Sequence, residues 1–217
     1  MIVAIDGPAG AGKSTVAKIL AQKLGFLYID TGAMYRAITL NALEKGLDFK
    51  DEQAIINIAR NSRIDLRSSK EGCAVVFLDN QDVSEDIRHP RITRYVSDLA
   101  KIPGVREVMV EMQRAMGKKR DVVMEGRDIG TVVFPDADKK FYLDAAGVER
   151  TRRRFKELKL KGEDVTVKDI ESDIKNRDKI DSTRKCAPLK RAEDAIYVDT
   201  TDMTIEEVVE KLLSYIH

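Results

Sequence analysis

The chain has 217 residues, of which 38 are Lys or Arg and 37 are Asp or Glu, so its net charge is +1. This balance excludes a protein whose whole surface is basic, and any site for an anion must be local. With 43% hydrophobic residues the chain is long enough to bury a core without disulfides. Cys73 and Cys186 are far apart and outside any metal-binding spacing, so we expect two free thiols.

No stretch of the sequence reaches the roughly 18 consecutive apolar residues that a membrane-spanning helix needs. The N-terminus is a short apolar run that ends at the charged residue Asp6, without the basic region of a secretory leader. We therefore expect a cytoplasmic monomer that binds neither a membrane nor nucleic acid.

Strand and helix patterns alternate in the first quarter of the chain. The spacing of apolar residues predicts, in chain order, a strand at 2–5, a helix over 14–24 that Gly25 ends, a strand at 26–29, a helix over 34–43 with Thr31 as its cap, and a helix over 52–59. Such alternation is typical of a parallel sheet covered by helices.

The pattern changes in the middle of the chain. Two short β runs, 64–66 and 74–78, are followed by the turn residues Asp79 and Asn80 ahead of Val83. This arrangement predicts a small antiparallel unit inserted into the α/β chain.

The rest of the chain returns to the earlier alternation. In chain order we expect helices at 92–100 and 105–116, strands at 121–124 and 140–143, a helix from 147 to about 161, a helix behind the capping box Thr166-x-x-Asp169, a strand at 195–198 and a C-terminal helix behind Thr204-x-x-Glu207. The two ends of the chain together predict an α/β fold with helices on both faces of a parallel sheet.

A glycine-rich segment lies between the first strand and the first helix, and it fits the Walker A pattern GxxxxGK(S/T). Glycines let the backbone wrap around a phosphate, so that backbone N–H groups and the positive end of the helix face the anion. We expect Lys13 to reach the β- and γ-phosphates and the Ser14 hydroxyl to ligate Mg²⁺. The expected nucleotide-binding residues are Gly7, Pro8, Ala9, Gly10, Ala11, Gly12, Lys13, Ser14 and Thr15.

Three classes of protein share this segment. GTPase switches normally have an NKxD segment that reads guanine, and this sequence has none. ATP-driven machines and regulators usually need larger modules than 217 residues allow. A small-molecule kinase remains, and it requires an acceptor pocket that keeps water away from the γ-phosphate.

The segment DTGAMYR at 30–36 is one candidate for this pocket, because it follows the second strand and opens beside the glycine-rich segment. Arg36 is a candidate clamp for an acceptor phosphate. Thr31 and Tyr35 belong to the same segment and are expected to contact the acceptor.

The segment EGRDIGT at 125–131 is the second candidate, because it follows the strand at 121–124. An acid at the end of a strand is the Walker B arrangement, so Glu125 is a candidate contact for Mg²⁺. Arg127 and Asp128 lie where open α/β sheets bind their ligands.

The segment 150–191 has a net charge of +7, whereas the whole chain has +1. Arg177, Asp181 and Arg184 are four and three residues apart, which places them on one face if the helix continues that far. A positive flap of this kind suits closing over polyphosphate and stabilising charge during phosphoryl transfer. Arg150 and Arg154, in the preceding helix, are candidate contacts for the adenine nucleotide.

The sequence holds two histidines, and neither lies in a motif. A phosphate monoester needs no general base, because its second pKa is about 6 and it is largely dianionic at pH 7. Many arginines and few histidines therefore favour a nucleoside monophosphate over an alcohol as the acceptor.

The segments GPAGAGKST (7–15), DTGAMYR (30–36), EGRDIGTVVFPDA (125–137) and RDKIDSTR (177–184), with APL at 187–189, closely resemble the bacterial cytidylate kinase family. The resemblance covers nearly the whole chain. Many NTPases share the first segment, whereas the second and third, in this order and spacing, are much more specific.

The resemblance implies a P-loop NTPase fold of three parts. These are a CORE with a five-stranded parallel sheet (1–35, 118–154 and 188–217), an NMP-binding insertion with a small antiparallel sheet (36–117), and a short LID (155–187). It also implies transfer of the ATP γ-phosphate, with Mg²⁺, to CMP or dCMP.

The resemblance assigns further roles residue by residue. Arg36, Arg127 and Arg184 are expected to hold the acceptor phosphate, Arg177 and Asp181 its sugar, and Ser97, Arg106 and Asp128 its cytosine. A carboxylate can accept a hydrogen bond from the 4-amino group of cytosine and repels O4 of uracil, while an arginine can donate to N3 and O2. Lys13, Arg127, Arg177 and Arg184 are the expected catalytic residues.

Some positions differ from other members of that family. Thr31 stands where some have Ser, Glu125 where some have Asp, and Lys179 and Ile180 make the LID less rich in arginine.

Two alternatives stay open: a kinase for another monophosphate, UMP or dTMP, and a nucleotide-sensing module whose output is a change of conformation.

Overall fold

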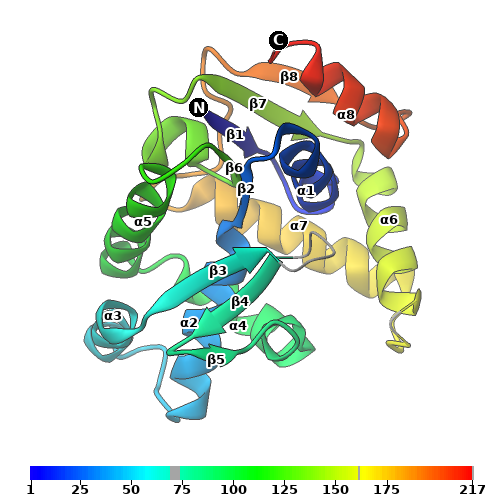
Figure 1. Cartoon of the computed structure of the whole chain (residues 1–217). Coiled ribbons are helices and arrows are strands. Elements are labelled where there is room, and N and C mark those ends of the chain that lie inside the picture. Colours follow the sequence, from blue (N-terminus) through cyan, green and yellow to red (C-terminus); the bar gives the residue numbers. More distant parts are fainter. Residues whose placement is uncertain (69–73, 161, 217) are drawn as a thin grey trace.

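The computed structural model describes residues 1–68, 74–160 and 162–216 and contains a five-stranded parallel sheet (Figure 1). Its strands lie in the order β2-β6-β1-β7-β8, so β1 is the central strand and pairs with both β6 and β7. The bounds are β1 Ile2–Asp6, β2 Leu27–Asp30, β6 Val122–Gly126, β7 Lys139–Asp144 and β8 Ile196–Asp199. The predicted parallel sheet is confirmed, and the carboxyl ends of its strands meet at one edge.

Helices cover both faces of this sheet. Side chains alternate along β1, so Val3 and Ile5 face one layer and Ala4 faces the other. The first layer contains α1 (Lys13–Leu24) and α8 (Ile205–Leu213), and the second contains α2 (Thr31–Glu44) and α5 (Pro103–Gly117). All three strand residues are fully buried, which explains why β1 is an almost continuous apolar run in the sequence.

A second, small antiparallel sheet lies beside α2 and next to β2, the edge strand of the main sheet (Figure 1). It is formed by β3 (Ile64–Ser68), β4 (Ala74–Leu78) and β5 (Gln81–Asp82), and it packs with α3 (Glu52–Asn61) and α4 (Pro90–Leu99) around one apolar core. Asp79 and Asn80 have φ of 50° and 72° and form the tight turn between β4 and β5. The predicted antiparallel insertion is confirmed.

The start of α2 differs from the sequence prediction. Asp30, not Thr31, caps this helix, because its carboxylate accepts a hydrogen bond from the backbone N–H of Ala33 at 2.9 Å. Thr31 is the first helical residue, and its hydroxyl donates to the backbone carbonyl of Glu125 at 2.7 Å. The hydroxyl that was expected to cap the helix instead joins α2 to the end of β6.

Two further helices, α6 (Gly147–Leu160) and α7 (Val167–Thr183), pack against each other (Figure 1). The α7 helix ends at Thr183, so Arg177 and Asp181 lie within it, as predicted, while Arg184 is its C-cap and follows the last helical residue. Thr166 caps α7 by accepting from the N–H of Asp169, whereas the full reciprocal capping box is found at Thr204 and Glu207 of α8.

Cys186 is a free thiol, and Cys73 lies outside the described residues. Within the part of the chain that the structure describes, no helix is both long and apolar enough to span a membrane.

Candidate functional site

The glycine-rich segment forms a loop that joins the central strand β1 to α1. Gly10 and Gly12 have φ of 79° and 84°, a conformation that side chains other than glycine rarely adopt. A Cβ at Gly7 would lie 1.9 Å from the carbonyl oxygen of Leu143, so a larger residue cannot fit there. The N-cap of α1 is Gly12, which has no side chain to cap the first turn, so the backbone N–H groups there can bind an anion.

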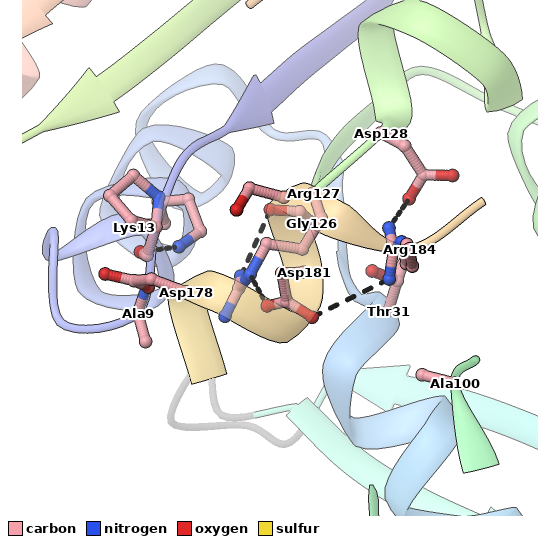
Figure 2. A network of polar contacts seen from close by, with 12 residues as sticks. Ala9, Lys13, Thr31, Ala100, Gly126, Arg127, Asp128, Asp178, Asp181 and Arg184 are labelled. Atoms are coloured by element: carbon pink, nitrogen blue, oxygen red, sulfur yellow. Dashed lines mark hydrogen bonds and ion pairs between the residues drawn. The ribbon is translucent and has the colours of Figure 1, made fainter. Parts of the chain in front are cut away.

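Lys13 is folded back onto this loop. Its side chain is buried, and its Nζ donates to the carbonyl oxygen of Pro8 at 2.6 Å (Figure 2). Burial, together with the positive charge of Arg127, lowers the pKa of Lys13 from 10.5 to about 7. A bound polyphosphate would favour the charged form of Lys13 and raise its pKa again.

Glu125, at the end of β6, is buried on the side of the sheet that faces α1. Its Oε1 accepts a hydrogen bond of 2.7 Å from the hydroxyl of Tyr28 on β2. Burial and the negative charge of Asp30 raise the pKa of Glu125, while Lys13 and hydrogen bonds from Ser14 and Tyr28 oppose that rise. The structure therefore places the two predicted metal-contacting residues, Ser14 and Glu125, within hydrogen-bonding reach.

This pair of residues suits Mg²⁺. Mg²⁺ prefers oxygen ligands and is usually held by one or two protein oxygens together with phosphate and water, instead of a closed protein cage. Ser14 offers a hydroxyl and Glu125 a buried carboxylate. No group of three or more His, Cys, Asp or Glu residues that could hold a metal occurs among the described residues. The donor set thus matches an ion that arrives with a nucleotide.

Asp6 is a site residue that the sequence analysis did not identify. Its carboxylate accepts from the backbone N–H groups of Ile129 and Gly130, both at 2.8 Å. Burial raises the pKa of Asp6 to about 6, although these two hydrogen bonds oppose the rise. Asp6 thereby anchors a short π-helix, Ile129–Val133, directly after Asp128. Its position as an acid between a buried strand and the glycine-rich segment was the available signal.

A pocket opens beside this loop at the carboxyl ends of β2 and β6. It brings together nine of the ten residues predicted to bind the acceptor, which come from α2, α4, α5, α7 and the segment after β6. They are Thr31, Tyr35, Ser97, Arg106, Arg127, Asp128, Arg177, Asp181 and Arg184. Gly32, Val96, Ala100 and Gly126 complete its lining.

An alternating chain of charges crosses the pocket (Figure 2). Arg106 donates to Asp128 at 2.5 Å, and Asp128 lies 3.5 Å from Arg184. Arg184 in turn lies 3.7 Å from Asp181, which accepts from Nε of Arg127 at 2.9 Å. All of these side chains are buried or nearly so, so each fixes the position of the next.

The pocket nevertheless holds more positive charge than it neutralises. Its lining contains four arginines, one of them Arg177, and two aspartates, a surplus of two positive charges. Three buried polar atoms of its lining have no hydrogen-bond partner among the residues that the structure describes: Nε of Arg106, Nε of Arg177 and the hydroxyl of Tyr35. Burial and the charge of Arg127 lower the pKa of Arg177 to about 9. Unpaired donors and surplus charge in one buried pocket indicate a site for an anion.

Arg36 is the predicted acceptor residue that does not line this pocket. Its guanidinium donates to the hydroxyl of Thr93 at 2.8 Å and to the carbonyl oxygen of Ile87 at 3.3 Å. Burial lowers its pKa to about 10. Its role as a phosphate clamp stays a prediction.

The two arginines predicted to contact the adenine nucleotide differ in their surroundings. Arg150 donates to the carbonyl oxygen of Ala9 at 3.0 Å and to the carboxylate of Asp178 at 2.5 Å. Asp178, on α7, also accepts from the N–H of Ala9 at 3.3 Å and is a second residue that the sequence analysis missed. Arg154 instead pairs with Glu157 on its own helix.

A third unpredicted group supports the loop from β8. Arg153 of α6 donates to the hydroxyl of Thr200 at 3.0 Å, and this hydroxyl lies 3.4 Å from the carbonyl oxygen of Ala11. Thr200 is buried directly after β8. The sequence around Thr200 does not predict this role, because the contacts of Thr200 join three segments that are far apart in the sequence.

Comparisons with known proteins agree with this geometry. A solved structure of an uncharacterised protein from Eubacterium ventriosum has a similar fold, with a TM-score of 0.53 over the whole chain and 97% of that protein at 13% identity. The cytidylate kinase family model matches residues 3–217. A cytidylate kinase from Caldanaerobacter subterraneus is 55% identical over 97% of this chain and 92% of its own length. One from Clostridioides difficile is 51% identical over 100% of this chain and 98% of its own length. The chain therefore belongs to the cytidylate kinase family.

Proposed function

We propose that this phosphotransferase takes the γ-phosphoryl group of ATP and transfers it to CMP or dCMP, giving ADP and CDP or dCDP. Membership of the cytidylate kinase family supports the reaction class and the acceptor. The main support for an acceptor site is the surplus of positive charge in the pocket beside the glycine-rich loop. A dianionic monophosphate would neutralise that surplus.

The donor is proposed to bind along the glycine-rich loop. Backbone N–H groups of the loop and of the first turn of α1 point to where the phosphates would lie, and Lys13 would exchange the carbonyl of Pro8 for a phosphate oxygen. Ser14 and Glu125 are proposed to hold Mg²⁺, which would neutralise charge on the donor phosphates.

The acceptor phosphate is proposed to bind among Arg127, Arg177 and Arg184. Arg127 and Arg184 are held in place by Asp181, while Arg177 has an unpaired Nε that is ready to donate. Arg127 and Arg177 lie close enough to Lys13 to lower its pKa, so they would also stabilise charge on the group in transfer. An acceptor that is already dianionic needs no base, and the catalysis is mainly positioning and charge stabilisation.

The base is proposed to be read by Asp128, Arg106 and Ser97. Asp128 is fixed by Arg106, so its carboxylate can accept from the 4-amino group of cytosine without moving. Uracil would present a carbonyl oxygen to the same carboxylate and leave that carboxylate without a hydrogen bond. The cost of this unpaired buried group would make UMP bind much more weakly than CMP.

The proposed division of the chain follows the same logic. Residues 36–117 would form the NMP-binding insertion and 155–187 the LID, around a CORE of the remaining residues. α7 lies within this LID and supplies Arg177 and Asp181, so the LID would contribute directly to the acceptor pocket.

An acceptor panel tests the proposed function. ADP release is measured with CMP, dCMP, UMP, dTMP, AMP and GMP at equal concentrations, with and without Mg²⁺. High activity on CMP or dCMP and little on the others is expected. A preference for UMP or dTMP would overturn the proposed reading of the base, and tight ATP binding without acceptor-dependent turnover would favour a nucleotide sensor.

A further inference from the structure

Tyr28 and Glu125 lie on neighbouring strands and point to the same face of the sheet. β2 and β6 are parallel, with Tyr28 opposite Val123 and Asp30 opposite Glu125. Tyr28 and Glu125 are therefore two positions apart along the strand direction, a separation that a tyrosine side chain can span. The hydroxyl of Tyr28 donates to Oε1 of Glu125 at 2.7 Å.

Glu125 needs such a partner because of its length and surroundings. A glutamate side chain has one more rotatable bond than an aspartate, and so it has more orientations to choose from. Lys13, the neighbouring cation, donates to Pro8 and does not bind the carboxylate in this structure. The hydroxyls of Tyr28 and Ser14 are the side-chain hydrogen-bond partners of Glu125 in the described part of the chain.

The packing holds Tyr28 itself in place. Its ring packs against the apolar core between the sheet and α1, where Val123 and Leu20 are buried. The position of its hydroxyl is therefore fixed by the packed strand β2. The orientation of Glu125 then depends on β6, which bears it, on Tyr28 of β2 and on Ser14 in the first turn of α1.

We propose that Tyr28 is a positioning residue for the Mg²⁺ of the donor nucleotide: its hydroxyl holds Oε1 of Glu125 and thereby orients the carboxylate beside Ser14. This inference rests on the proposed function, since it concerns the same ion. Partners of this kind commonly change metal affinity by 10- to 100-fold when they are removed.

Nucleotide binding tests this role without turnover. Calorimetric titration with the non-hydrolysable donor AMP-PNP is carried out in Mg²⁺ and in EDTA, on the natural chain and on Tyr28→Phe. Tyr28→Phe is expected to weaken binding in Mg²⁺ by about tenfold and to leave binding in EDTA unchanged. Electron spin resonance with Mn²⁺ and AMP-PNP then measures the loss of ion affinity directly.

Tyr197→Phe is the matched control. Tyr197 of β8 also forms a side-chain hydrogen bond to an aspartate near the end of a parallel strand, Asp144, but this pair is away from Ser14 and Glu125. Removing its hydroxyl is expected to leave both titrations unchanged. Thermal unfolding of each variant compares their stability.

A double-mutant cycle with Glu125→Gln tests whether Tyr28 acts through Glu125. In the Glu125→Gln background the Tyr28→Phe change is expected to have no further effect on Mg²⁺-dependent binding. Equal losses in Mg²⁺ and EDTA, no loss in Mg²⁺, or additive losses in the cycle would each overturn the inference. If the natural chain binds AMP-PNP equally in Mg²⁺ and EDTA, the proposed Mg²⁺ site itself fails.

Discussion

The proposed donor loop and the proposed acceptor pocket would recognise anions in different ways. The donor loop offers backbone N–H groups and one lysine, all within the continuous segment 7–15. The acceptor pocket uses side chains from four helices and one strand end, which form an alternating network of charges. Backbone N–H groups can bind any polyphosphate, whereas a network of side chains can distinguish one base from another. The donor loop would therefore accept any nucleoside triphosphate tail, and the acceptor pocket would select the base.

The two regions meet along α7. Arg177 lines the acceptor pocket, and the next residue, Asp178, contacts Ala9 and Arg150 at the donor loop (Figure 2). A shift of this one helical turn would change both regions together. The predictions below test whether each substitution affects the donor side, the acceptor side or both.

The largest effect is expected for Lys13→Ala. Loss of the buried ammonium should reduce kcat by about 10²–10³-fold, because a charge stabiliser at the transferred phosphoryl group is removed. Steady-state kinetics with CMP measures this loss, and Lys23→Ala, an exposed lysine at the end of the same helix, is the control. Near-normal turnover in a folded Lys13→Ala protein would contradict the assignment of the donor loop.

Asp128→Asn should affect the acceptor side. An amide keeps the size of the carboxylate but weakens its preference for an amino group, so the ratio of kcat/KM for CMP to that for UMP should fall by about 10- to 100-fold. The KM for ATP should stay nearly constant. Because Arg106 then lacks a charged partner in a buried place, unfolding by denaturant should also require about 3 kcal/mol less free energy. An unchanged ratio would show that Asp128 does not read the base.

Asp178→Asn should have a smaller effect, and on the donor side. The Asp178 carboxylate lies against the N–H of Ala9 and the guanidinium of Arg150, where it repels incoming phosphates. Removing its charge should strengthen AMP-PNP binding several-fold, by an amount on the order of 1 kcal/mol. Asp173→Asn, on an exposed part of α7, is the control. Weaker binding in Asp178→Asn would mean that the carboxylate assists the donor.

The smallest expected effect is proton uptake on donor binding. The pKa of Lys13 is lowered to about 7 without ligand, and bound phosphates should raise it. Above pH 7 the free lysine is largely neutral, so ATP binding takes up to about one proton and weakens as the pH rises from 7 to 9. Calorimetry in two buffers with different heats of protonation measures the uptake. Lys13→Arg stays charged and should take up none at this position.

Local sequence was sufficient for several features of the molecule. The glycine-rich loop needs left-handed backbone at Gly10 and Gly12, and the box at Thr204 and Glu207 starts α8 through neighbouring atoms. The five parallel strands and the antiparallel insertion follow from apolar periodicity and from the turn residues of β4–β5. These features depend on residues a few positions apart, so a single sequence contains their causes.

Other features depend on contacts between distant segments. Asp6 reaches the N–H groups of Ile129 and Gly130, Tyr28 reaches Glu125, and Asp178 reaches Ala9. The periodicity of each segment indicates which face is buried, but not which polar group of another segment lies opposite. The sequence by itself determined the order of the main helices and strands and the glycine-rich loop, but not the start of α2 or the π-helix at Ile129–Val133. Only the tertiary structure decided how acids and arginines pair, because burial makes every polar group depend on a partner that packing supplies.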